Sequence, residues 1–211
     1  MEYQNLKNTW KGREVHNLNF TEQFMGEVSQ IATSINTKVI DQMVDELIKL
    51  RERRGRLFIL GVGGSAGNSS HAVNDFRKLT NIETYSPTDN VSELTARTND
   101  EGWNTFFSRW LEVSNLRSDD GIIIFSVGGG NRELNISAGI CDAIDLALER
   151  NVLIMGIVGR DEGYVQAKAD TCLIVPPLFP ERITPHSEAF QAVVWHLIVS
   201  HPLLAISKTK W

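Results

Sequence analysis

The sequence predicts an α/β fold: a three-layer α/β/α sandwich in which helices cover both faces of a five-stranded, mostly parallel sheet. Short apolar runs rich in β-branched residues have the length of buried strands, and they lie at residues 57–60, 121–125, 152–158 and 171–175. Helical patterns separate these runs, at about residues 65–80, 103–116 and 132–150. Continuous apolar strands that alternate with helices are typical of a parallel sheet buried on both faces.

Three further elements complete the predicted fold. Residues 20–49 are expected to form a long N-terminal helix, because apolar side chains recur every three or four positions and no proline interrupts them. Its apolar stripe is wider than a small sheet covers, so we expect it to pack partly on another subunit. A weaker fifth strand fits residues 82–85, and a last helix fits residues 187–200. We therefore expect a single domain over residues 1–211, with an N-terminal helical extension over about residues 1–54.

The composition argues against a nucleic-acid or membrane role. The chain has 211 residues and a formal net charge of -5, whereas nucleic-acid and membrane-surface binding normally need a net basic face. No apolar stretch approaches the roughly 18 residues of a membrane span, and the first residues do not begin a signal peptide. Cys141 and Cys172 are not closely spaced, so we expect two free thiols and a cytoplasmic location.

A glycine-rich turn over residues 61–70 joins the first strand to the next helix and predicts an anion site. Glycine lets backbone N–H groups approach an anion, and the helix N-terminus adds partial positive charge. Gly63, Gly64 and Ser65 are therefore expected to hold a phosphate, with Ser65 adding a hydroxyl donor. The spacing of the glycines, with Glu83 further along, also matches a dinucleotide fingerprint, so this turn alone leaves both ligands open.

A second glycine-rich turn favours a phosphorylated sugar over a nucleotide. It follows the strand at residues 121–125, is expected to open another helix, and contains Ser126, Gly128, Gly129, Gly130 and Asn131. Two such turns on two strands can converge on one phosphate, whereas a dinucleotide fold does not require the second. We therefore expect a sugar phosphate ligand and no nucleotide cofactor.

Four polar residues on two predicted helices could supply chemistry next to this phosphate site. His71 and Asp75 are four residues apart and share a helix face, and Glu188 and His196 are eight residues apart on the last helix. A carboxylate and an imidazole suit the proton transfers of aldose–ketose isomerisation. The same four residues are also a suitable N/O ligand set for Zn²⁺. Spacing alone does not decide between the two uses.

Several stretches resemble the sugar isomerase (SIS) domain family and, within it, the sedoheptulose-7-phosphate (phosphoheptose) isomerases. The resemblance covers roughly residues 20–200. It rests on residues 61–65 followed by His71, on residues 98–104 and 107–109, on the turn at Ser126, and on His196. The most specific part is residues 98–109, which is similar to the family's G-N-D-x-G-F-N-x-x-F-S-R stretch.

The resemblance implies a fold, an assembly and roles for the site residues. Members of the family are tetramers of α/β/α subunits with active sites at subunit interfaces. The implied roles are phosphate binding by Ser65 and Ser126 and sugar binding by Asp100, with Asn99 beside it. His196 matches the catalytic histidine, and Asp75 stands at the position of the catalytic glutamate. In some members, residues that match His71, Asp75, Glu188 and His196 bind zinc.

The sequence departs from the family pattern at the site itself. Asp75 is one methylene shorter than the family's glutamate, which moves its carboxylate about 1 Å away from a substrate placed identically. Glu188 replaces a glutamine, and the Ser126 turn exchanges hydroxyl side chains for glycines. These changes favour a related but different phosphosugar, or a divergent branch of the family.

We expect an aldose–ketose isomerase that acts through an enediol on sedoheptulose 7-phosphate or a related heptose phosphate. Asp75 and His196 are the expected acid–base pair, and Zn²⁺ is a candidate cofactor. The alternative is a SIS protein that binds and senses a phosphosugar without turnover. In either case we expect a homo-oligomer, tetramer or dimer, that does not bind nucleic acid or membranes.

Overall fold

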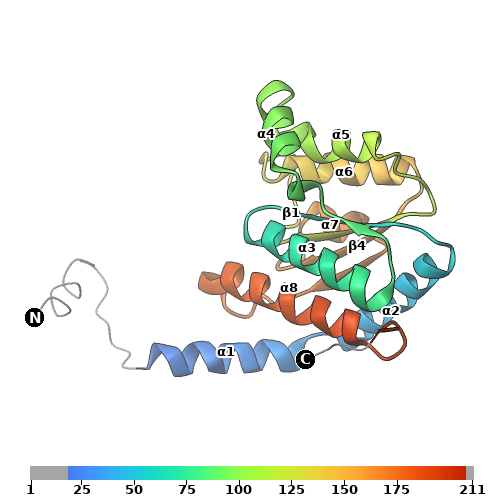
Figure 1. Cartoon of the computed structure of the whole chain (residues 1–211). Helices are drawn as coiled ribbons and strands as arrows, with labels where there is room; N and C mark the ends of the chain where they lie inside the picture. The colour runs from blue at the N-terminus through green and yellow to red at the C-terminus, as the bar shows by residue number, and fades with distance from the viewer. Residues whose placement is uncertain (1–18, 208–211) are drawn as a thin grey trace, which may run out of the picture. The chain divides into compact units, whose positions relative to one another are not determined.

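The computed structural model of the chain describes residues 19–207 (Figure 1). By its internal contacts the chain divides into two units, with the boundary between Thr33 and Ser34. Within the first unit the described structure is essentially helix α1, which continues to Ser34 (Phe20–Ser34). The predicted domain limits stay a prediction, and residues 1–18, where the signal-peptide question arises, lie outside the described residues.

The expected single helix over residues 20–49 is wrong, because the structure has two helices there. Helix α1 ends at Ser34, and helix α2 spans Thr37–Glu52. Between them Asn36 has an extended backbone (φ -78°, ψ 92°), and its side chain accepts a hydrogen bond from the Lys38 N–H. Asparagine competes for backbone N–H groups in this way and starts a helix rather than continuing one. The periodicity of the apolar residues does not register such a break.

The second unit contains the predicted five-stranded sheet, and every strand pair in it is parallel. The strand order is β2-β1-β3-β4-β5. The bounds are β1 Leu57–Gly61, β2 Thr84–Tyr85, β3 Gly121–Ser126, β4 Leu153–Val158 and β5 Thr171–Ile174. All residues of β1 and β3 are buried, as continuous apolar runs require. From β1 the chain adds β2 on one side of the sheet and then β3, β4 and β5 on the other side. The order of the strands therefore reverses between β1 and β3, which is the topological switch point of the sheet.

Helices cover both faces of this sheet, which confirms the three-layer prediction (Figure 1). Helices α5 and α6 pack on one face, where Phe58, Ile122 and Ile144 belong to the core cluster. Helices α2, α3 and α8 lie on the other face, with α3 against β1 and α8 against α3. The bounds are α3 Gly64–Asp75, α4 Val91–Asp100, α5 Phe106–Val113, α6 Ala138–Glu149, α7 Tyr164–Lys168 and α8 Ile183–Ser200.

Two predicted helix starts differ from the structure. Helix α6 begins at Ala138 rather than at residue 132, because residues 131–136 form a tight turn closed by a bridge between Asn131 and Ile136. Helix α8 begins at Ile183, four residues before the expected start, and takes Pro185 into its first turn. Proline is tolerated there because a first-turn N–H has no intrahelical partner. Helix α4 was not predicted.

Every helix within residues 19–207 is too short or too polar to cross a membrane. Both cysteines are free thiols. Burial raises the pKa of the Cys172 thiol to about 12, so this thiol is protonated at neutral pH.

A buried ion pair joins the starting ends of β1 and β3. The Asp120 side chain has no exposed surface, and it accepts hydrogen bonds from the Arg56 N–H (2.9 Å), Nε (3.1 Å) and Nη2 (2.6 Å). It also accepts one from the Arg117 N–H (3.0 Å). These hydrogen bonds raise the pKa of the Arg56 guanidinium above its usual range. The pair therefore aligns the first residues of the two central strands.

We predict that Asp120→Ala lowers the free energy of unfolding by about 3 kcal/mol, because it leaves a half-buried guanidinium and two N–H groups without their acceptor. Urea denaturation at neutral pH measures the change. Asp119→Ala is the matched control, since Asp119 is exposed. An equal loss in both variants would show that the ion pair does not stabilise the strand ends.

Candidate functional site

The turn between β1 and α3 has the geometry of an anion site. Gly63 has φ 64° and ψ -128°, a combination that only glycine adopts readily. It precedes the first residue of α3 and offers no side chain to cap the helix. The Ala66 and Gly67 N–H groups donate to the Gly63 carbonyl, whereas the N–H groups of Gly64 and Ser65 have no side-chain cap from Gly63 and add partial positive charge. The Ser65 side chain is buried at this point.

The two predicted phosphate turns leave neighbouring strands at the same level. Gly61, the last residue of β1, pairs with Phe125 of β3, and Ser126 follows directly. Adjacent strands are about 4.8 Å apart, so both turns lie at one edge of the sheet. The strand register therefore supports the expectation that the two glycine-rich turns converge on one ligand.

The turn that begins at Ser126 does not lead into a helix at residue 132, as expected, because α6 starts only at Ala138, and the turn is held by other contacts. The Ser126 Oγ accepts a hydrogen bond from the Gly129 N–H (3.0 Å), which leaves its own hydrogen free to donate. The Gly129 and Gly130 carbonyls accept the Val165 and Tyr164 N–H groups at the start of α7 (both 2.9 Å). The Asn131 side chain accepts the Leu134 N–H (2.9 Å) in the following tight turn. Several hydrogen-bonding groups of this loop are therefore already used in contacts that stabilise the loop itself.

A cleft of about 450 Å³ opens on one face of α3. Its lining residues are Gly61, Val62, Gly63, Ala66, Gly67, Ser70, Thr88, Asp89, Leu94 and Trp103. Asn99 and Asp100 are not among them. Both are exposed at the end of α4, where the Asn99 Nδ2 donates to the Asp100 Oδ1 (2.8 Å). Within one chain, the structure does not bring these two predicted sugar-binding residues to the cleft.

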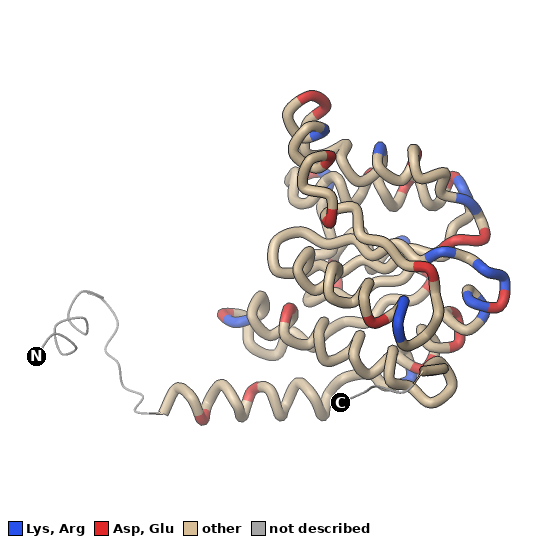
Figure 2. Tube along the Cα trace, viewed as in Figure 1, with Lys and Arg blue, Asp and Glu red and all other residues tan. Residues whose placement is uncertain are grey.

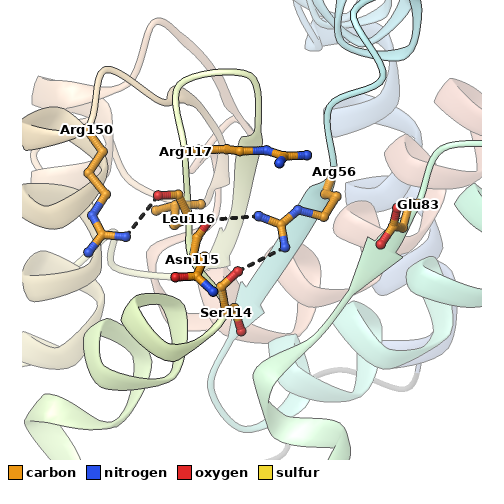
Figure 3. A pocket seen from close by; sticks show the side chains of 7 residues that line it. All are labelled: Arg56, Glu83, Ser114, Asn115, Leu116, Arg117 and Arg150. Carbon is orange, nitrogen blue, oxygen red and sulfur yellow. Dashed lines mark hydrogen bonds between the residues drawn. The ribbon is translucent and has the colours of Figure 1, made fainter.

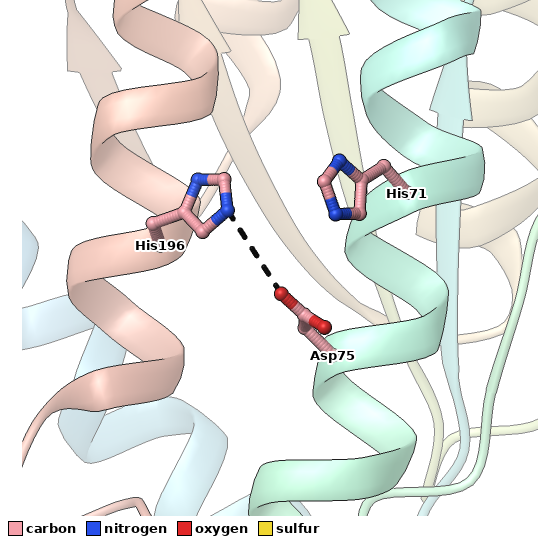
Figure 4. Close-up of side chains that lie close together, drawn as sticks. All are labelled: His71, Asp75 and His196. Atoms are coloured by element: carbon pink, nitrogen blue, oxygen red, sulfur yellow. Dashed lines mark ion pairs between the residues drawn. The ribbon is translucent and has the colours of Figure 1, made fainter. Parts of the chain in front are cut away.

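On the face of α3 that meets α8, three of the predicted site residues come together (Figure 4). His71 and Asp75 extend from α3 and His196 extends from α8, with one donor atom from each within 4.8 Å of the others. The His196 Nε2 lies 3.9 Å from the Asp75 Oδ2, and the two imidazole rings are nearly perpendicular at 5.4 Å. Asp75 is buried, whereas both histidines are exposed. The packing of α3 against α8 therefore assembles this cluster.

Two further contacts orient the donor atoms of this cluster. The His196 Nδ1 lies 2.7 Å from the Ala192 carbonyl oxygen, which can only accept, so Nδ1 carries a hydrogen. In the neutral ring the Nε2 lone pair then faces Asp75. The Asp75 Oδ1 accepts a hydrogen bond from the Asn74 Nδ2 (2.8 Å), which leaves Oδ2 for other partners. Both free atoms can take a proton or bind a cation. The sequence offered no signal for Asn74 beyond its position next to Asp75.

Glu188 does not join the other three predicted metal ligands. Its carboxylate oxygens lie 2.5 Å and 2.8 Å from the place that a Cβ atom on Gly64 would occupy. A spacing of eight residues along α8 separates Glu188 from His196 by about 12 Å of helix rise, so the two meet different parts of α3. Glu188 therefore reaches the first turn of α3, and His196 reaches the last.

The position of Glu83 removes the basis for a dinucleotide site. Glu83 precedes β2, and its carbonyl accepts the Leu57 N–H (2.8 Å) at the starting end of β1. The glycine-rich turn lies at the opposite end of β1, roughly 16 Å away for five residues of strand. The two parts of the fingerprint therefore cannot bind one nucleotide.

Several of the proteins that are similar in sequence are phosphoheptose isomerases. No family model matches the chain. The chain is 30% identical to a phosphoheptose isomerase of Helicobacter pylori (strain Shi470), over 62% of this chain and 67% of that protein. It is 26% identical to the phosphoheptose isomerase of Aneurinibacillus thermoaerophilus, over 87% of this chain and 95% of that protein.

Two further comparisons extend this similarity. The chain is 32% identical, over 70% of its length, to the lincomycin biosynthesis protein LmbN of Streptomyces lincolnensis, of which it spans 56%. Among solved structures, phosphoheptose isomerase GmhA from Neisseria gonorrhoeae is similar with a TM-score of 0.71 and 24% identity, over 82% of this chain and 89% of that one. At this identity the structural likeness shows the fold alone.

We predict that Gly163→Ala distorts the Ser126 turn and costs about 1–3 kcal/mol of stability, because its Cβ would overlap backbone. That atom would lie 2.4 Å from the Gly128 carbonyl oxygen and 2.7 Å from the Gly129 Cα. Thermal unfolding measures the effect. Gly128→Ala is the matched control on the same loop, since its Cβ would meet nothing within 4 Å. Equal melting temperatures for the two variants would contradict the assigned contact.

Proposed function

Because the chain belongs to the phosphoheptose isomerase-like family of sugar isomerase (SIS) proteins, we propose that it is an aldose–ketose isomerase of heptose phosphates, with sedoheptulose 7-phosphate as the first candidate substrate. The observation that carries the proposal is the cluster of His71, Asp75 and His196 on two packed helices. One of these helices, α3, begins at the anion-binding turn, so the same helix serves the phosphate and the reacting carbons.

The acid–base roles follow from the positions of the Asp75 and His196 side chains. Isomerisation through an enediol removes a proton from one carbon and delivers one to its neighbour, which requires a base and an acid in reach of adjacent atoms. The Asp75 Oδ2 and the His196 Nε2 are 3.9 Å apart, a distance that lets them face the two carbons of one C1–C2 bond. We assign Asp75 and His196 to this proton transfer, with Asn74 and the Ala192 carbonyl holding them in orientation.

The phosphate group is assigned to the two turns at the end of β1 and β3. The hydroxyl groups of Ser65 and Ser126 are the side-chain donors, and the backbone of Gly63, Gly64 and residues 128–130 surrounds them. The adjacency of the two strands and the uncapped start of α3 support this assignment.

The remaining roles are proposals that rest on the family resemblance. Asn99 and Asp100 are proposed to orient sugar hydroxyls, and their exposure in one chain is consistent with a site completed by a second subunit. A homo-oligomeric state, dimer or tetramer, and a cytoplasmic location are proposed on the same basis.

Zinc fits the donor set of the cluster. Two imidazole nitrogens and one carboxylate oxygen are the protein ligands typical of a catalytic zinc site with an open fourth position. His71, Asp75 and His196 would hold the ion through the same atoms that carry the proton transfer, so zinc binding is the alternative use of this cluster, and a bound ion would polarise the sugar carbonyl. The neutral Nε2 of His196, set by the Ala192 carbonyl, is the form that binds a metal.

A second candidate function is phosphosugar binding without turnover. Its support is Asp75, whose short side chain places the carboxylate deeper than a glutamate would and leaves it buried. The two functions differ in what happens after the ligand binds.

We predict that Asp75→Asn and His196→Ala each lower kcat for sedoheptulose 7-phosphate by about 100-fold or more, because each removes one proton-transfer group. Asp75→Glu restores the longer carboxylate and is expected to retain turnover. Asp41→Asn, an exposed position on α2, is the control. Ligand-induced thermal stabilisation of the wild type without turnover of heptose, hexose or pentose phosphates, with or without Zn²⁺, would favour the binding function.

We also predict that Zn²⁺ raises the melting temperature of the wild type but not that of His71→Ala, since this variant lacks one of three ligands. Glu188→Gln is expected to keep the zinc effect, because Glu188 lies against Gly64 rather than in the cluster. Thermal unfolding of metal-free protein with added Zn²⁺ measures both. Loss of the effect in Glu188→Gln would instead support a four-ligand site.

A further inference from the structure

A cavity of about 590 Å³ lies at the amino end of the sheet, away from the turns that carry the proposed active site (Figure 3). Its lining residues are Arg56, Glu83, Ser114, Asn115, Leu116, Arg117 and Arg150. They come from the segments that precede β1, β2, β3 and β4. Its size falls in the range of about 300–1,000 Å³ that is typical of small-molecule sites.

Two of the three arginines are held by hydrogen bonds to carbonyl oxygens. Arg56 donates through Nη1 to the Ser114 carbonyl and through Nη2 to the Asn115 carbonyl (both 2.9 Å), in addition to its hydrogen bonds to Asp120. Arg150 donates through Nη1 to the Leu116 carbonyl (2.9 Å). A guanidinium fixed in this way loses little side-chain entropy when a ligand binds.

The cavity retains free donors and positive charge. One of the five N–H groups of Arg56 is unused, and Arg150 uses one of its five in the described hydrogen bonds. The Arg117 side chain is 60% exposed, and its contact with Asp120 is a distant 3.9 Å. The buried carboxylate of Asp120 balances Arg56 and does not line the cavity. Among the residues that line the cavity, Glu83 is the one acidic residue, against the three arginines.

This local charge contrasts with the rest of the chain. The formal net charge is -5, yet Lys and Arg gather around the turn between α2 and β1 (Figure 2), and this turn leads into Arg56, which lines the cavity. Arg53 and Arg54 in that turn add to the positive potential. A concave surface with an excess of positive charge concentrates anionic ligands.

We propose that this cavity binds a small phosphate ester at a site separate from the substrate site. Planar guanidinium groups match the geometry of phosphate oxygens, and in Figure 3 Arg117 extends towards Arg56 while Arg150 lies on the other side of Leu116. Glu83 would accept hydrogen bonds from hydroxyl groups of the same ligand. The Tyr85 hydroxyl already donates to its Oε1 (2.8 Å), which leaves Oε2 for this role.

Isothermal titration with inorganic phosphate at low ionic strength tests the proposal, because phosphate probes both sites. The wild type should show two classes of binding. Arg117→Glu should weaken one class at least tenfold and leave sedoheptulose 7-phosphate turnover intact. This variant is expected to fold, since the Arg117 side chain makes no hydrogen bond among the described residues. The double variant Ser65→Ala, Ser126→Ala should lose the other class.

Two further variants keep the result interpretable. Arg109→Glu makes the same charge change at an exposed position outside the cavity and should leave both classes unchanged. Arg150→Lys keeps the positive charge but loses the paired N–H donors of the guanidinium. It should weaken the same class of phosphate binding as Arg117→Glu does. The proposal is overturned if only one class is found and the serine variant abolishes it, or if Arg117→Glu binds phosphate like the wild type. Neither result depends on whether the wild type isomerises a sugar.

Discussion

Strands β1 and β3 pair in parallel with Gly61 opposite Phe125, and this register determines where the site can form. It brings the two glycine-rich turns to one edge of the sheet and starts α3 there, with its uncapped N–H groups beside Ser126. At the other end of the same strands, the buried Asp120 and Arg56 hold the register. A slip of one residue would turn every strand side chain to the opposite face and separate the two turns.

The reacting groups depend on a second contact, the packing of α3 against α8. Each helix alone presents histidine or aspartate to solvent, and only their packing creates a cluster with atoms within 4.8 Å. Contacts within each helix then orient the two side chains: the Ala192 carbonyl fixes the position of the hydrogen on the His196 ring, and Asn74 orients the Asp75 carboxylate. Preorganisation by neighbours of this kind is what makes a proton-transfer pair or a metal site effective.

The two ends of the sheet have different chemistry because strand and helix ends differ. At the carboxyl ends, helix α3 begins and supplies N–H groups that attract an anion. At the amino ends, chain segments that follow α5 expose carbonyl oxygens, and Arg56 and Arg150 bind them. The arginines that serve this structural need also line the cavity next to it, so one set of side chains supports the fold and offers an anion site.

The sequence by itself determined the strands, the layer order and the four candidates from which the cluster is drawn. Short continuous apolar runs between helices are typical of buried parallel strands. His71 and Asp75 share one face of a helix because they are four residues apart. It did not determine helix starts, because Asn36 and Asn131 act through local hydrogen bonds that leave the apolar periodicity unchanged. Nor did it place Glu188, or show that Asn99 and Asp100 lie outside the cleft. Those positions depend on how α8 and α4 pack, and packing is set by contacts between segments far apart in the chain.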